Sequence, residues 1–294
     1  MYKFFIFVIF ICFANNIIAA APNYQQAKVR SGFYLKAFSD VDRADIEVAM
    51  LFWITEIAKK ANLSTSNHFY TSIEKMHQDF LQHKINFILA SPLPIVKNFD
   101  PLLLADGYKV IWDGSAEDTL LVLTHKQSKL LQFSELNDKH LSLLMNDPIS
   151  QMYVDMLALE NFGKKPNQIF NKVSGSKTSN QLILNLFFRK TDVIFVYEKF
   201  YKLAIELNPQ IKKDTQIISS LTNIPRALGY FHKDVDPVLM NIVLSEVEKL
   251  HHYAKGQQLL EIFHADKAIR SSIADLHSTQ QLIKRYQNLI KENP

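Results

Sequence analysis

The sequence contains almost no cysteine, since Cys12 is the only one among its 294 residues. Cys12 lies in an apolar run near the N-terminus that we expect to be removed, so the remaining chain would have neither disulfides nor thiol chemistry. A lipoprotein would require a small residue before its cysteine, and here Ile11 precedes it. The pattern therefore excludes a disulfide scaffold, a thiol enzyme and a lipid anchor at Cys12.

The sequence also lacks any concentration of charge. The formal net charge is only +4, and the basic residues are spread along the chain without a block, so nothing indicates nucleic acid binding. The ten histidines are scattered, and His251 and His252 are adjacent rather than four residues apart, as a helical metal site would favour. We therefore expect no metal, no cofactor and no nucleic-acid partner.

Only one stretch is apolar enough to suggest a membrane-directed segment. Lys3 precedes an apolar run over residues 4–13, and small residues follow at 19–21. The run is about half of the roughly 20 residues that cross a bilayer as a helix, and no later segment comes close. This pattern predicts a signal peptide over residues 1–20 and a soluble exported protein, with an uncleaved anchor as the alternative.

The remaining chain alternates short apolar runs with helical patterns, which predicts an α/β fold with mainly parallel strands. A strand over 28–38 precedes a helix over 40–63, for which Asp40 or Asp42 would be the N-terminal cap. A strand near 66–70, a helix over 71–85 and a strand over 85–91 follow. The buried face of the first helix has the spacing i, i+3, i+4, i+7 and i+11, given by Ile46, Ala49, Met50, Trp53 and Ile57.

The length exceeds what one hydrophobic core usually serves, so we expect two lobes. A strand from 108, a turn at Asp113-Gly114 and a longer strand would carry the chain from one sheet to another. The strand near 216–221 would carry it back, and the chain from residue 235 onward has helical patterns. The predicted first lobe comprises residues 21–118 and 224–294, and the second comprises residues 119–223.

Along the chain, five motifs follow in the order YTS (70–72), SP (91–92), DPIS (147–150), SGSK (174–177) and TDVIFV (191–196). Motifs in this order resemble the PhnD-like periplasmic phosphate, phosphite and phosphonate binding proteins of ABC transporters. In the first lobe, Tyr70 and Ser72 match the family's Y-x-S pattern, and Pro92 matches its G-P turn. Asn86 stands where aspartate is usual, and Ser91 stands for the glycine of that turn.

In the second lobe, the family pattern D-P-x-S-x-S-G is matched by Asp147, Pro148 and Ser150, while Met152 and Tyr153 replace its second serine and its glycine. Further matches to a G-S-H motif and a V-D-A-A strand are Gly175, Ser176, Lys177 and Asp192, with Lys177 in place of histidine. The resemblance implies a type 2 periplasmic binding protein fold: two hinged lobes, each a mostly parallel sheet flanked by helices, that close over a ligand.

The physical chemistry of these turns suits an oxyanion. A helix start leaves backbone N–H groups unpaired and carries a partial positive charge, to which Ser150 would add a hydroxyl and Lys177 a full charge. The alternative is that Asp147 caps the helix and occupies those N–H groups itself. Bulky Met152 and Tyr153 would indicate a different ligand or a weakened site.

The other candidate ligand-binding residues are less specific. Tyr34 and Tyr70 stand at predicted strand ends, where each is either pocket wall or ordinary packing. Asp192 could bind an amine on the ligand, pair with Lys177 or end the preceding helix. With Ser72, Ser91, Ser150, Ser176 and Lys177, these complete the predicted ligand site.

The leading functional hypothesis is a periplasmic solute-binding protein, acting as a monomer, that delivers a small anion to an ABC permease. The alternative is a sensory or signalling adaptor of the same fold that docks on a membrane receptor, with its ligand site altered or lost. An enzyme is not expected, because the sequence offers no Ser-His-Asp order with supporting turns, no thiol and no close carboxylate pair at the predicted cleft.

Overall fold

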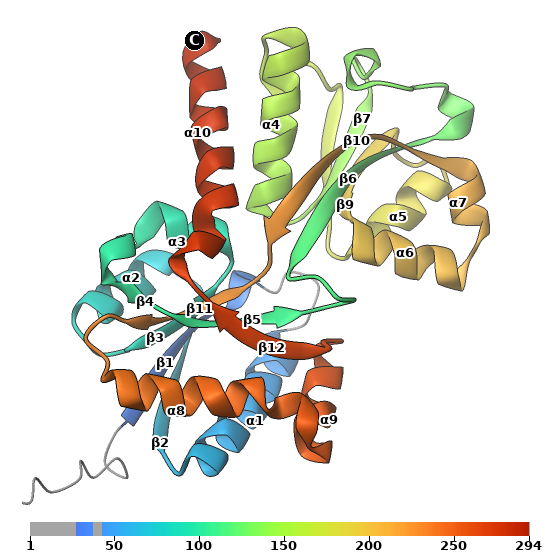
Figure 1. Ribbon diagram of the computed structural model, residues 1–294. Coiled ribbons are helices and arrows are strands. Elements are labelled where there is room, and N and C mark those ends of the chain that lie inside the picture. The colour runs from blue at the N-terminus through green and yellow to red at the C-terminus, as the bar shows by residue number, and fades with distance from the viewer. Residues whose placement is uncertain (1–27, 38–42, 294) are drawn as a thin grey trace, which may run out of the picture.

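The computed structural model describes residues 28–37 and 43–293, and these form two sheets flanked by helices (Figure 1). The predicted α/β class is confirmed. The predicted signal peptide, Cys12 and the candidate caps Asp40 and Asp42 lie outside the described residues. Within the described ranges, no helix combines the length and the apolarity needed to cross a membrane.

The first lobe is built on a seven-stranded sheet of order β12-β5-β11-β3-β1-β2, with β4 paired to β11. Helices α1, α8 and α9 cover one face of this sheet, and α2 and α3 cover the other. The strands are β1 (Lys28–Tyr34), β2 (Ser64–Tyr70), β3 (Phe87–Ala90), β4 (Leu104–Ala105), β5 (Gly107–Ile111), β11 (Leu228–His232) and β12 (Lys267–Ser271). The helices are α1 (Arg43–Ala61), α2 (Ile73–Leu81), α3 (Pro92–Asn98), α8 (Pro237–Glu248) and α9 (Ala254–Ile262).

The second lobe is built on a five-stranded sheet of order β10-β6-β9-β7-β8, with α4 on one face and α5, α6 and α7 on the other. The strands are β6 (Glu117–His125), β7 (His140–Leu144), β8 (Lys172–Ser176), β9 (Val193–Tyr197) and β10 (Thr215–Pro225). The helices are α4 (Pro148–Phe162), α5 (Ser179–Phe187), α6 (Glu198–Leu207) and α7 (Gln210–Asp214).

Local sequence signals explain several of these elements. All five residues predicted for the buried face of α1 are buried. Helix α2 begins after Ser72, whose hydroxyl accepts a hydrogen bond from the Lys75 amide. Short 3₁₀ turns connect the larger elements: η2 (Leu35–Ala37), η3 (Pro101–Leu103), η4 (Lys126–Ser128), η5 (Phe133–Glu135), η6 (Pro166–Gln168), η7 (Leu250–His252) and η8 (Ile273–Leu276).

The sheets are mixed, whereas the sequence pattern predicts mostly parallel strands. Strands joined through helices are parallel, as in β1 with β2 and β7 with β8. The strands that carry the chain between lobes run antiparallel to their neighbours, as in β6 with β9 and β11 with β3. These strands enter each sheet from the side of the other lobe. They therefore run in the opposite direction to the strands that are connected through helices.

The chain crosses between the sheets twice. The first crossover joins β5 to β6 through the predicted turn, where Asp113 and Gly114 have positive φ angles of 48° and 76°. The Trp112 amide donates to the Ser115 carbonyl at 2.9 Å and closes this turn. The second crossover joins β10 to β11 at residues 226–227, so the chain returns at the end of the strand that was predicted to carry it back.

The last helix, α10 (His277–Glu292), lies beside α4 (Figure 1). The sequence assignment gave residues 224–294 to the first lobe. However, α10 packs its apolar side chains on the core of the second lobe, through Leu282, Ile283, Tyr286 and Leu289. We therefore propose that α10 belongs to the second lobe and that residues 226–276 belong to the first.

Candidate functional site

A cleft of about 530 Å³ lies between the two lobes, which we call the interlobe cleft. It opens where the carboxyl ends of β1, β3, β7 and β8 lead into turns and helices, as is usual for ligand sites in α/β sheets. The first lobe contributes Tyr34, Lys36, Ser91 and Pro94, and the second contributes residues 143–148, Gln151 and residues 173–175.

Among the described residues, the first-lobe wall carries three polar side chains. Tyr34 ends β1 and is buried, and burial, with a smaller contribution from the charge of Glu74, raises the pKa of its phenol. Lys36 follows in η2 and is exposed. Ser91 is the N-cap of α3, but its hydroxyl makes no cap hydrogen bond. These residues present a hydroxyl, a cation and a second hydroxyl to the cleft.

The second-lobe wall includes the first turn of α4, whose N-terminus is capped by the side-chain carboxylate of Asp147. Asp147 Oδ1 accepts a hydrogen bond from the Ile149 amide at 3.2 Å, and Asp147 Oδ2 accepts one from the Ser150 hydroxyl. The Tyr197 hydroxyl also donates to Oδ1, at 3.2 Å. Burial raises the pKa of Asp147, and these hydrogen bonds offset only part of that rise. An anionic ligand in the cleft would therefore meet a carboxylate as well as a helix N-terminus.

Two further polar side chains reach the cleft from the second lobe. Ser174 Oγ lies 2.8 Å from His140 Nε2, and the Gln151 side chain donates to Asp155 at 3.0 Å. Sequence reasoning missed Lys36, Ser174 and Gln151. The usable signal for Lys36 was its position two residues beyond Tyr34, near the carboxyl end of a predicted strand.

The predicted ligand residues differ in their position relative to the cleft. Tyr34 and Ser91 line the interlobe cleft. Ser150 and Ser176 are buried behind its wall: Ser150 donates to Asp147, and Ser176 Oγ lies 3.4 Å from Ser142 Oγ. Lys177 follows Ser176, is exposed and is not among the lining residues.

Tyr70 and Ser72 have partners within the first lobe. Tyr70 is the register partner of Tyr34 in the neighbouring strand, but its hydroxyl donates to Asp79 Oδ2 at 3.1 Å. The Ser72 hydroxyl donates to Glu74 at 2.7 Å while it accepts from the Lys75 amide. Neither residue lines the cleft in this arrangement.

Asp192 lies at the amino end of β9, the central strand of the five-stranded sheet, on the side opposite the cleft. It precedes β9, and its carboxylate accepts a hydrogen bond at 2.8 Å from the amide of His140, the first residue of β7. The cleft is at the carboxyl end of β7, so the length of that strand separates Asp192 from it. Asp192 therefore does not line the cleft in this arrangement, and its carboxylate holds together the starts of two parallel strands.

The substitutions at Met152 and Tyr153 do not add bulk to the cleft. Both side chains are buried in the core of the second lobe, and the Tyr153 hydroxyl contacts Ser219 Oγ at 2.7 Å. Asn86 is likewise structural, because its side chain accepts from the Arg30 amide and donates to the Lys28 carbonyl. The expectation of a different ligand or a weakened site therefore gains no support from bulk in the cleft.

Comparison with protein families identifies the chain. The family model described as "ABC transporter, phosphonate, periplasmic substrate-binding protein" matches residues 36–276. The chain belongs to this family. The resemblance drawn from the sequence motifs is thereby confirmed, and the phosphonate-binding family consists of transport components rather than enzymes. A comparison with curated proteins finds no match.

Solved structures with the same architecture support the assignment of the fold. A Xanthomonas citri protein bound to ATP has a TM-score of 0.66 at 11% identity, and the match covers 90% of this chain and 99% of that one. A binding protein component of an ABC phosphonate transporter from Pseudomonas aeruginosa has a TM-score of 0.65 at 12% identity, with 92% and 89% covered. PhnD1 from Prochlorococcus marinus, in complex with methylphosphonate, has a TM-score of 0.62 at 11% identity, with 88% and 98% covered. The phosphonate-binding family member described here thus has the two-lobed fold of periplasmic binding proteins.

Proposed function

We propose that this protein binds a small phosphate- or phosphonate-like anion in the interlobe cleft and delivers it to an ABC permease. The observation that carries the proposal is the position of Lys36 and the N-terminus of α4 on the two walls of one cleft. A cation on one lobe and a helix N-terminus on the other would both be attracted to an anion, so the ligand would draw the lobes together.

The donors around the cleft fit such a ligand. Lys36 supplies a charge, and Tyr34 and Ser91 supply hydroxyls from the first lobe. Ser150, Ser176 and Lys177 would act from the second lobe, the two serines by orienting the α4 turn and the end of β8, and Lys177 by reaching the ligand on closure. Tyr70 and Ser72 would support the strand end and helix start beside Tyr34. Pockets of this kind use a few placed polar groups for specificity.

The predicted location follows from the same proposal. A signal peptide over residues 1–20 would export the protein to the periplasm, where a monomer would exchange ligand with a membrane permease. Light scattering on the purified mature chain tests the monomer, and N-terminal sequencing of exported protein tests cleavage after Ala19 or Ala20.

The ligand is tested by thermal unfolding of the mature protein with a panel of anions: phosphate, phosphite, alkylphosphonates, aminoethylphosphonate, sulfonates and small carboxylates. A ligand present at 100 times its Kd adds about 2.7 kcal/mol to the free energy of unfolding. We expect one phosphorus oxyanion to raise the melting temperature. A flat response across the panel contradicts the transport proposal.

The second candidate is a sensory adaptor of the same fold that docks on a membrane receptor. The observation in its favour is that Asp147 already occupies donors of the α4 N-terminus and brings a negative charge to the anion site. A flat anion panel together with saturable binding of the protein to its own cell membranes would support this candidate. A clear ligand in the panel would remove its main support.

A further inference from the structure

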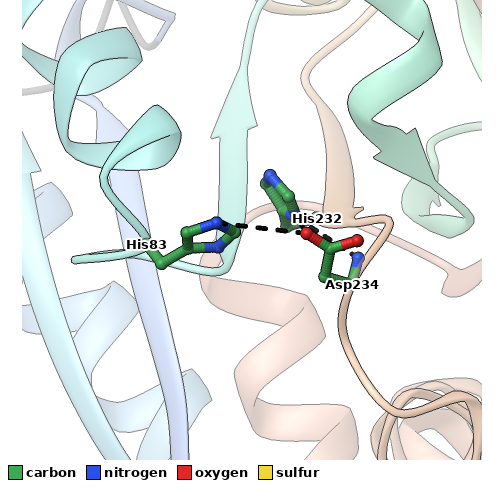
Figure 2. Close-up of side chains that lie close together, drawn as sticks. All are labelled: His83, His232 and Asp234. Atoms are coloured by element: carbon green, nitrogen blue, oxygen red, sulfur yellow. Dashed lines mark hydrogen bonds and ion pairs between the residues drawn. The ribbon is translucent and has the colours of Figure 1, made fainter.

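Three potential metal ligands lie close together in the first lobe (Figure 2). They lie at the ends of β3 and β11 that are farther from the interlobe cleft. His83 lies in the turn after α2, His232 ends β11, and Asp234 lies in the turn that follows β11. The His232 amide donates to the Asn86 carbonyl at 2.9 Å, just before β3 begins. The other end of β3 leads to Ser91 in the cleft, five residues after Asn86, so the two places are about 17 Å apart at about 3.3 Å per residue.

One ligand atom from each of the three side chains lies within 4.8 Å of the other two. Asp234 Oδ2 is 3.5 Å from His232 Nδ1 and 4.0 Å from His83 Nε2. Ligands of tetrahedral zinc lie about 2.0–2.2 Å from the metal, which places them about 3.4 Å from one another. The cluster therefore needs only a small contraction to enclose an ion.

The three side chains differ in mobility in a way that suits metal capture. The His232 side chain is only 4% exposed, and the centroid of its ring lies 4.7 Å from that of Phe80 and 4.5 Å from that of His83. His83 and Asp234 have 53% and 58% of their side chains exposed, so both can rotate toward a fixed imidazole. Figure 2 shows the His83 ring and the Asp234 carboxylate turned toward His232.

We propose that His83, His232 and Asp234 bind a divalent transition metal ion such as Zn²⁺, with solvent completing the coordination. Two imidazoles and a carboxylate are ligands that zinc accepts. The ion would replace the 3.2 Å hydrogen bond that the Asp234 amide donates to His232 Nδ1. The site escaped the sequence analysis because its members come from two turns far apart in the chain.

The electrostatics of the cluster favour a neutral imidazole that is ready to bind. Burial lowers the pKa of His232, the charge of His83 lowers it further, and Asp234 opposes the shift. A metal ligand must be unprotonated, so a lowered pKa reduces competition from protons. Two imidazoles in contact cannot both become charged without repulsion, whereas one shared cation satisfies both rings.

The test is calorimetric titration of chelator-treated, untagged protein with zinc chloride. We expect one zinc ion per chain and a higher melting temperature in zinc than in chelator. The variants His83→Ala and Asp234→Asn should each weaken zinc binding at least about tenfold, which is the lower end of the loss for altered metal shells. Both residues are exposed, so neither variant should prevent folding.

The matched control is His264→Ala. His264 is also exposed, also follows a helix, and has φ of 51° against 53° for His83, so both variants place alanine in the same left-handed conformation. Zinc affinity should be unchanged in this control. The proposal is overturned if the unaltered protein binds no zinc, if either His83→Ala or Asp234→Asn retains full affinity, or if His264→Ala loses as much.

Discussion

Arg226 and Asp118 form an ion pair, 3.1 Å between Nη2 and Oδ2, at the place where the chain crosses between the lobes. Arg226 follows β10 and Asp118 lies in β6, so the pair joins the two crossover segments. The guanidinium also stacks over Trp112, 4.4 Å from the ring centroid. Burial lowers the pKa of Arg226, and Asp118 and Asp113 oppose that shift.

Asp118→Asn should lower the free energy of unfolding by about 3 kcal/mol, because it leaves the Arg226 charge nearly buried and unpaired. Urea unfolding measures the change. Glu160→Gln is the control, because it removes the exposed Arg285–Glu160 pair of 2.6 Å, for which less than about 1 kcal/mol is expected. Equal losses in the two variants would show that the Arg226–Asp118 pair does not stabilise the crossover.

Asp147→Asn should strengthen binding of a phosphorus oxyanion at least about tenfold, because it removes a like charge from the anion site while keeping an acceptor for the Ile149 amide. Calorimetric titration measures the change in affinity. The control is Asp192→Asn, which lies at the opposite end of the strands of the same sheet and should leave affinity unchanged. Weaker binding in Asp147→Asn would show that the carboxylate itself contacts the ligand.

The same carboxylate gives a pH dependence whose sign follows from its raised pKa. The folded state binds the Asp147 proton more readily than the unfolded state does, so this group destabilises the fold at neutral pH. The penalty fades as the pH falls through the folded pKa and is gone below the unfolded value of about 3.9. The gain in melting temperature of Asp147→Asn should therefore be largest near pH 7 and shrink toward pH 4. A gain that grows on acidification contradicts the raised pKa.

Lys36→Ala should reduce anion affinity at least about tenfold, because Lys36 is the cation that lines the interlobe cleft. Lys177→Ala is the informative comparison, since Lys177 was predicted from the sequence but lies beyond the lining residues in this arrangement. Both side chains are exposed, so the melting temperature without ligand should stay nearly constant. Lys177→Ala should reduce affinity less than Lys36→Ala, since Lys177 would reach the ligand only on lobe closure. A larger loss for Lys177→Ala would contradict the assignment of Lys36 as the main cation of the site.

Tyr70→Phe should cost about 1 kcal/mol of stability and leave ligand affinity unchanged, because its hydroxyl serves Asp79 rather than the cleft. Tyr34→Phe is the paired variant, since Tyr34 is the register partner of Tyr70 but lines the cleft. It should lower affinity with less effect on stability. Thermal unfolding and titration of both variants separate the two roles, and the reverse pattern would exchange them.

Regular periodicity and turn chemistry made much of the fold predictable. The α1 face from Ile46 to Ile57 was predictable because a helix that packs on a sheet must bury one stripe. The turn at Asp113-Gly114 was predictable because these residues tolerate positive φ. The side of the molecule on which α10 packs was not, since an amphipathic helix does not specify which lobe receives its apolar face.

The candidate site was less predictable, for reasons visible in individual residues. The sequence placed Asp147 and Ser150 at a helix start, but it did not predict the hydrogen bond between their side chains. Met152 and Tyr153 were expected to change or weaken the ligand site, yet both side chains turn into the core, because which face of α4 meets the sheet depends on tertiary packing. Lys36 was missed because the first strand was predicted to continue to residue 38, whereas β1 ends at Tyr34. Asp192 does not line the cleft because it precedes β9, and the cleft lies at the carboxyl ends of the strands.

Helix α10 has a mechanical consequence. It starts from η8, which is fixed to the first lobe by the Tyr230 hydroxyl on the Ser272 carbonyl, and it ends against α4, where Tyr286 donates to Asp155 at 2.9 Å. The lobes are thus joined by three covalent links among the described residues: the two strand crossovers and the η8–α10 corner. A body attached at three points has fewer directions in which to swing than one attached at two. Closure of the lobes over a ligand would therefore have to bend the chain near residues 272–277 together with the two crossovers, and the packing of α10 on α4 would restrict that movement.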